Sequence, residues 1–100
     1  MSKDFPEGAV MVFGGSGGIG KGVAMEFAKA GTAVAICYRS KKEVAEATAE
    51  AIRALGVKAS IHQMDVRNRA EVIAGIEAAV AEHGRVHSIV WGAGPIVAQV

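Results

Sequence analysis

A glycine-rich segment constrains the fold of this chain more than any other feature: residues 14–22 read GGSGGIGKG. It follows an apolar run, Ala9–Phe13, and residues with helical spacing continue from Gly18 to Ala30. Glycine permits sharp turns and a close approach of the backbone to a ligand. The amino terminus of the following helix offers unpaired N–H groups and a positive dipole end. The sequence therefore predicts a strand, a loop and a helix arranged around a phosphate-bearing ligand.

The same loop fits more than one phosphate-binding template. Residues 15–20 fit G-x-G-x-x-G, and a wider spacing, G-x-x-x-G-x-G, is also present. Residues 15–21 fit the start of a Walker A loop, but Gly22 stands where an NTPase needs the Ser or Thr that binds magnesium. A tight turn without a ligand is the alternative, although the loop holds more glycine and serine than a turn requires. The predicted contacts are Gly14, Ser16, Gly17, Gly18, Ile19 and Gly20.

Strand and helix patterns alternate along the rest of the chain. Strands are predicted at Thr32–Tyr38, Val57–Met64 and Val86–Trp91, and helices start at two capping-box patterns, residues 40–43 and 68–71, and end at Gly56 and Gly84. This β-α-β-α-β-α-β alternation predicts an α/β fold, a doubly wound, Rossmann-like parallel sheet with the strands in the order 3-2-1-4. The predicted inner faces of the two later helices are Val44, Ala47, Ala51, Ile52 and Leu55, and Val72, Ile73, Ile76, Ala79 and Val80.

The fourth strand is predicted to have an uncovered edge. The last residues, Pro95–Val100, are too few to supply a helix that could cover it. An exposed apolar strand invites pairing with other chains. We therefore expect residues 1–100 to be the N-terminal part of a single, longer nucleotide-binding domain, or to be completed by another chain.

Composition excludes several classes of function. A net charge of +1 gives no strong attraction to nucleic acid or to a membrane surface. Cys37 is the only cysteine, so no internal disulfide can form, and its apolar strand predicts a core position. No run approaches the length of a membrane span, and no apolar leader is seen, so we expect a cytoplasmic protein. His62, His83 and His87 match no metal-ligand spacing.

Residues after the second and third strands bear on the choice of ligand. A site for NAD usually carries a carboxylate at the end of the second strand, whereas Tyr38, Arg39 and Ser40 stand there, followed by two lysines. Arg39 could bind a 2′-phosphate, which favours NADP; the alternative is a solvated helix start. Asp65 and the Val66 N–H could bind adenine, or Asp65 could simply cap a turn.

Together these motifs resemble the N-terminal, cofactor-binding half of a short-chain dehydrogenase/reductase. The resemblance rests on residues 13–20 at the end of the first strand, on the basic residues at the end of the second strand, on Asp65-Val66 after the third strand, and on residues 91–94 after the fourth strand. It implies backbone contacts to the cofactor at Gly92, Ala93 and Gly94. Two departures are notable: Phe13 replaces the family's Thr, and Trp91-Gly92 replaces paired asparagines.

The resemblance also implies an activity. Members of this family use NADP or NAD to transfer a hydride between the nicotinamide and a carbonyl or alcohol, and many are dimers or tetramers. Their catalytic Ser, Tyr and Lys would lie beyond residue 100, so no catalytic residue is assigned here. The alternative is a non-catalytic module that binds or senses a dinucleotide.

Overall fold

A computed structural model describes residues 7–14, 18–91 and 97–99 of the chain. The strands are β1 (Ala9–Phe13), β2 (Ala33–Tyr38), β3 (Ala59–Gln63), β4 (Val86–Trp91) and β5 (Val97–Gln99). The helices are α1 (Gly18–Lys29), α2 (Lys42–Arg53) and α3 (Arg69–His83).

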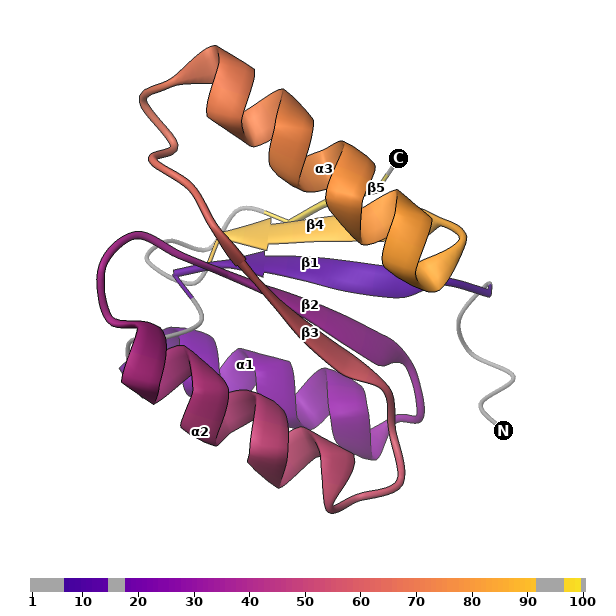
Figure 1. The fold of residues 1–100 in the computed structure, drawn as a ribbon. Coiled ribbons are helices and arrows are strands. Elements are labelled where there is room, and N and C mark those ends of the chain that lie inside the picture. Colours follow the sequence, from indigo (N-terminus) through magenta and orange to yellow (C-terminus); the bar gives the residue numbers. More distant parts are fainter. Residues whose placement is uncertain (1–6, 15–17, 92–96, 100) are drawn as a thin grey trace.

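The described strands form one sheet in the order β3-β2-β1-β4-β5. The pairs β1–β2, β1–β4 and β2–β3 are parallel. In Figure 1, α1 and α2 cover one face of this sheet and α3 covers the other. The predicted doubly wound fold and its strand order, including the edge position of β3, are confirmed.

The prediction that β4 has an uncovered edge is wrong. Residues Val97–Gln99 form β5, which pairs with β4 in the antiparallel direction. A short antiparallel strand can follow its neighbour through a brief connection, whereas a parallel one needs a long crossover. The residues that are too few for a helix are therefore enough to pair with this edge.

The core consists of two layers, one on each face of β1 and β2. Every residue of β1 is buried, which explains its unbroken apolar sequence. Val10, Val12, Val34 and Ile36 face α1 and α2, whereas alternate residues, including Cys37, pack with Met64 beneath α3. The buried position predicted for Cys37 is confirmed, because its side chain is 2% exposed.

The predicted inner face of α2 is largely wrong. Its buried residues are Ala45, Thr48, Ala49 and Ile52, whereas Val44 and Leu55 are 40% and 46% exposed. Alanines of α2 join those of α1 in one cluster, because small side chains let two helices approach closely on the sheet. Buried Thr48 is tolerated there because its hydroxyl donates to the Val44 carbonyl at 3.0 Å.

Of the two predicted helix caps, the one at α2 is absent and the one at α3 is present. The N-cap of α2 is Lys41, with no side-chain cap, so the predicted capping role of Ser40 is wrong. The predicted cap of α3 is confirmed, since Asn68 Oδ1 accepts from the Glu71 N–H at 3.2 Å. On α3, Val72, Ile76 and Ala79 face the core as predicted. Ile73 and Val80 were also predicted to face inward, but they are 50% and 40% exposed.

Candidate functional site

The carboxyl ends of the parallel strands meet at one edge of the sheet. Phe13, the last residue of β1, is in register with Cys37 of β2 and with Trp91 of β4, and Tyr38 is in register with Gln63 of β3. The segments that follow these strands therefore share this edge, which is where ligands bind in open α/β sheets. Those predicted cofactor-binding residues that the structure describes lie in or beside these segments.

Gly14 turns the chain out of β1. Its φ of 76° lies in the left-handed region that favours glycine, and its N–H donates to the Cys37 carbonyl at 3.1 Å. The helix α1 then begins at Gly18, so Gly18, Ile19 and Gly20 form its first turn, as predicted. This turn carries no acidic residue, and the first N–H groups of a helix have no partner within the helix, so the dipole end of α1 favours an anion. Ser16 and Gly17 lie outside the described residues.

The end of β2 presents a basic surface. Tyr38 is buried at 7% exposure, and its ring belongs to the core cluster beneath α1 and α2. The next two residues, Arg39 and Ser40, are exposed. The Arg39 carbonyl accepts from Gln63 Nε2 at 3.2 Å, and the Tyr38 carbonyl accepts from the Met64 N–H at 2.9 Å. These contacts hold the segments after β2 and β3 together.

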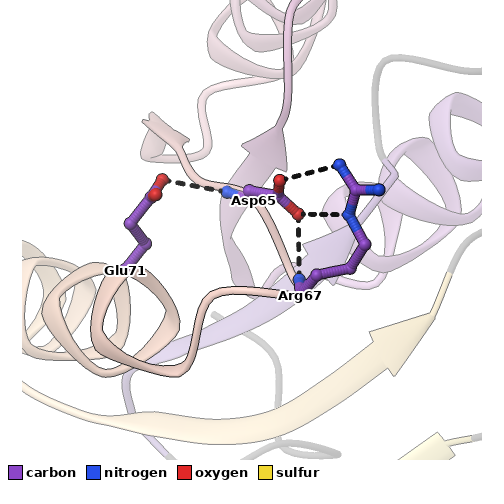
Figure 2. Close-up of polar contacts among 3 residues, drawn as sticks. All are labelled: Asp65, Arg67 and Glu71. Atoms are coloured by element: carbon purple, nitrogen blue, oxygen red, sulfur yellow. Dashed lines mark hydrogen bonds and ion pairs between the residues drawn. The ribbon is translucent and has the colours of Figure 1, made fainter.

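Asp65 is held in a network after β3 (Figure 2). Its Oδ1 accepts from the backbone N–H of Arg67 at 2.9 Å and from Arg67 Nε at 3.1 Å, and its Oδ2 accepts from Arg67 Nη2 at 3.0 Å. The hydrogen bonds from Arg67 lower the pKa of Asp65 to about 2, and the positive charge of Arg39 adds to this lowering. Asp65 is therefore ionised at neutral pH, and the positive charge of Arg39 helps to stabilise its negative charge.

Sequence reasoning missed two members of this network. It left Arg67 out, although an arginine two residues after an Asp in a turn can fold back onto the carboxylate. It expected Glu71 to close a capping box with Asn68, whereas Glu71 Oε1 accepts from the Asp65 N–H at 3.1 Å. The alternative role of Asp65, capping a turn, is borne out by the hydrogen bond that it accepts from the Arg67 N–H. Its contact with adenine stays a prediction.

The remaining predicted contacts are less informative. Val66 is 47% exposed, and the contact of its N–H with adenine stays a prediction. Gly92, Ala93 and Gly94 lie outside the described residues, directly after the end of β4. The described groups as a whole fit an anionic dinucleotide: an acid-free helix terminus, an exposed Arg39, and the Asp65 carboxylate followed by an exposed Val66.

Comparison with known proteins identifies the family. A sequence profile described as short chain dehydrogenase matches residues 8–100. The chain belongs to the short-chain dehydrogenase family. The resemblance inferred from its motifs is therefore confirmed.

Individual members of the short-chain dehydrogenase family show how far the likeness extends. A 3-oxoacyl-(acyl-carrier-protein) reductase of Aggregatibacter actinomycetemcomitans is 40% identical over 85 residues, covering 85% of this chain and 35% of the relative. A short-chain dehydrogenase/reductase homolog of Bacillus subtilis is 41% identical over 80 residues, covering 80% of this chain and 73% of the relative. The chain thus spans about a third of the length of the Aggregatibacter reductase.

Solved structures of the family share the fold described here. A Serratia marcescens short-chain dehydrogenase/reductase variant matches with a TM-score of 0.81 and 31% identity, over 89% of this chain and 36% of that chain. A short-chain type dehydrogenase/reductase from Mycobacterium ulcerans matches with a TM-score of 0.77 and 32% identity, over 91% of this chain and 33% of that chain.

The histidines and acidic residues in the described part of the chain do not form a metal site. Within it, no group of three or more His, Cys, Asp or Glu side chains could hold a metal ion. His62 and His83 both contact Ser60, whereas His87 contacts Thr32 and Ser88. Among the described helices, none is long and apolar enough to cross a membrane.

Proposed function

We propose that the protein is an NADP(H)-dependent oxidoreductase that transfers a hydride between the nicotinamide and a carbonyl or alcohol substrate. The observation that carries this proposal is the exposed Arg39 at the carboxyl end of β2, where a site for NAD would carry a carboxylate. The bound nicotinamide supplies the hydride chemistry. The residues described here bind and orient the cofactor.

Each element of the site has a role in this proposal. The N–H groups at the start of α1 bind the pyrophosphate, since an acid-free helix terminus favours an anion. Arg39 and the Ser40 hydroxyl bind the 2′-phosphate, with Arg39 supplying a planar, permanently charged donor group. Asp65 and Val66 lie at the adenine end. Ser16 and Gly17, and the segment Gly92–Gly94, would supply further contacts.

The reaction itself is inferred from relatives. The reductase of Aggregatibacter actinomycetemcomitans is named for reducing a 3-oxoacyl group, which supports a carbonyl compound as substrate. The catalytic Ser, Tyr and Lys are proposed to lie beyond residue 100. The single, buried Cys37 is consistent with a reducing, cytoplasmic environment, and we propose that the protein is a homo-oligomer, a dimer or a tetramer.

The test is the cofactor preference and its dependence on Arg39. Dissociation constants for NADP and NAD, measured by titration at fixed ionic strength, should favour NADP by about 10- to 100-fold, the scale of a hydrogen bond to a charged group. Arg39→Ala should remove most of this preference and leave the affinity for NAD nearly unchanged. Arg85→Ala is the matched control, because Arg85 is an exposed arginine at the amino end of β4, the opposite edge of the sheet.

Two results would contradict the proposal. Equal affinities for NADP and NAD in the unmutated protein would show that the end of β2 does not distinguish the 2′-phosphate. Binding of NADP without hydride transfer to any of a panel of carbonyl and alcohol substrates would favour the alternative, a dinucleotide-binding or sensing module.

A further inference from the structure

The strand β3 has an open outer side. Within the described part of the chain, β3 pairs with β2 along one side and no strand pairs with the other (Figure 1). The Lys58 carbonyl and the Met64 N–H form hydrogen bonds to β2. Because the direction of the backbone N–H and C=O groups alternates along a strand, the odd-numbered residues between them, Ala59, Ile61 and Gln63, present these groups to the outer side.

Charged side chains cover the two ends of this outer side. Arg53 Nη2 donates to the Ala59 carbonyl at 2.9 Å, and Glu71 Oε1 accepts from the Asp65 N–H at 3.1 Å. Between these two contacts, the outward backbone groups of β3 form no hydrogen bond with any of the described residues. An edge strand with free N–H and C=O groups is a template for pairing with another strand.

A groove of about 370 Å³ runs between β3 and α3. The β3 residues Ile61 and Gln63 line one of its walls, and three small residues of α3, Ala74, Gly75 and Ala78, line the other. The Ile61 side chain packs against the core cluster on the opposite face of the sheet. A strand that approaches the outer side of β3 therefore meets no bulky side chain from α3 along this wall.

The charges at the two ends of the outer side are opposite. Arg53 and the exposed Lys58 lie at the start of β3, whereas Glu71 lies just past its end. Arg53 is also paired with Glu50 of its own helix at 2.7 Å. A second copy of β3 added in parallel would place like charges together, which opposes association. An antiparallel second copy would place the positive end of each strand against the negative end of the other.

We propose that the outer side of β3 pairs with β3 of a second copy of this chain, in the antiparallel direction, so that the two sheets become one. The two-fold axis lies at Ile61, the middle residue of β3, so Ile61 pairs with the partner's Ile61 and Gln63 with the partner's Ala59. Arg53 of each copy then lies beside the partner's Glu71. This interface goes beyond the proposed function, because it lies along the side of the sheet and requires no cofactor.

Ile61→Pro tests the pairing of the two backbones. Proline has no N–H, but the Ile61 N–H points away from β2, so the change removes no hydrogen bond between β2 and β3. Ile61→Val is the matched control, because it keeps both the N–H and a β-branched side chain. In sedimentation equilibrium of the full protein, Ile61→Pro should have half as many subunits as the unmutated protein and as Ile61→Val. An equal number of subunits in all three would overturn the proposal.

Charge reversal tests the same interface without changing the backbone. Arg53→Glu and Glu71→Arg should each weaken association by roughly ten-fold or more, because each places like charges opposite each other at two symmetric positions. The double variant should recover association, since it restores opposite charges across the axis. Glu77→Arg is the matched control, because Glu77 is an exposed glutamate of α3 that does not line the groove. A double variant weaker than both single variants would contradict the antiparallel pairing.

Amide hydrogen exchange locates the interface directly. The Ile61 N–H should exchange quickly in dilute protein and slowly at concentrations where sedimentation shows association, because pairing gives this group an acceptor. Fast exchange of the Ile61 N–H in associated protein would show that the copies meet elsewhere, and would overturn the proposal. A monomer at every concentration would also overturn it, and would leave Arg53 and Glu71 as side chains that protect the edge of the sheet from pairing.

Discussion

Acid should loosen the packing of β3 against the end of α3 through His83. The Ser60 hydroxyl lies 2.7 Å from His83 Nε2 and 2.8 Å from His62 Nε2, so it joins the edge strand to the helix. The other ring nitrogen of His83, Nδ1, is buried and has no hydrogen-bond partner among the described residues. Protonating the ring would place an N–H there with no acceptor.

The environment of His83 sets the size of the effect. Burial, and then the charge of Lys58, lower the pKa of His83 from 6.5 to about 4, although Glu82 acts in the opposite direction. For a fully buried group such a change would be worth roughly 3 kcal/mol. The ring is only half-buried, and solvent screens exposed charges, so we expect about 1 kcal/mol.

The direction of the pH dependence follows from this lowered pKa. Between pH 6.5 and about 4 the unfolded chain binds a proton at His83 that the folded protein does not. The free energy of unfolding should therefore be highest above pH 6.5 and fall as the pH falls toward 4. His62 should contribute in the same direction, because burial lowers its pKa, although Glu82 partly offsets this.

Urea unfolding at a series of pH values from 4 to 8 measures this dependence. His83→Gln keeps a polar atom near Ser60 but cannot titrate, so its unfolding free energy should fall less steeply below pH 6.5, by about 1 kcal/mol over the range. His62→Gln is the comparison and should flatten the curve less. Parallel curves for His83→Gln and the unmutated protein, or an NMR titration of His83 at 6.5 or above, would refute this reasoning.

Three further predictions concern packing, capping and reactivity. A Cβ on Gly75 would overlap Met64 Cε, the flexible end of a buried side chain, so Gly75→Ala should stabilise the protein by less than the value of about 1 kcal/mol expected inside a helix, and by more in a Met64→Val background, as urea unfolding would show. Asn68→Ala should cost about 1 kcal/mol of unfolding free energy, whereas Ser40→Ala, at a helix without a side-chain cap, should cost nearly nothing. Burial raises the pKa of Cys37 to about 12, so a thiol reagent at pH 8 should label it only in urea; rapid labelling of the native protein would contradict this.

Local chemistry explains why some elements were predictable. Β1 is buried on both faces by its neighbours and therefore reads as an unbroken apolar run, which the sequence shows directly. The cap of α3 is equally local, since Asn68 needs only the N–H three residues ahead. Alternating strands and helices then leave few topologies, because crossovers are right-handed.

Other features depended on which residues approach from elsewhere in the fold. The sequence pattern of α2 favoured Val44 and Leu55 as inward, but the helix turns its alanines toward α1, where only small side chains permit close contact. The pairing of β5 with β4 could not be predicted from residues 97–99 alone, because so short a segment has no periodicity of its own.

The sequence by itself determined that the carboxyl ends of the parallel strands meet at one edge, because alternating strands and helices with right-handed crossovers allow few strand orders. The binding of a phosphate-bearing ligand at this edge is a prediction from the glycine loop. Only the tertiary structure decided how Asp65 is used there. A carboxylate in a turn can accept from a ligand or from its own neighbours, and the choice depends on side-chain geometry that residue order does not specify. Here Arg67 folds back onto the carboxylate, and Glu71 reaches the Asp65 N–H from α3.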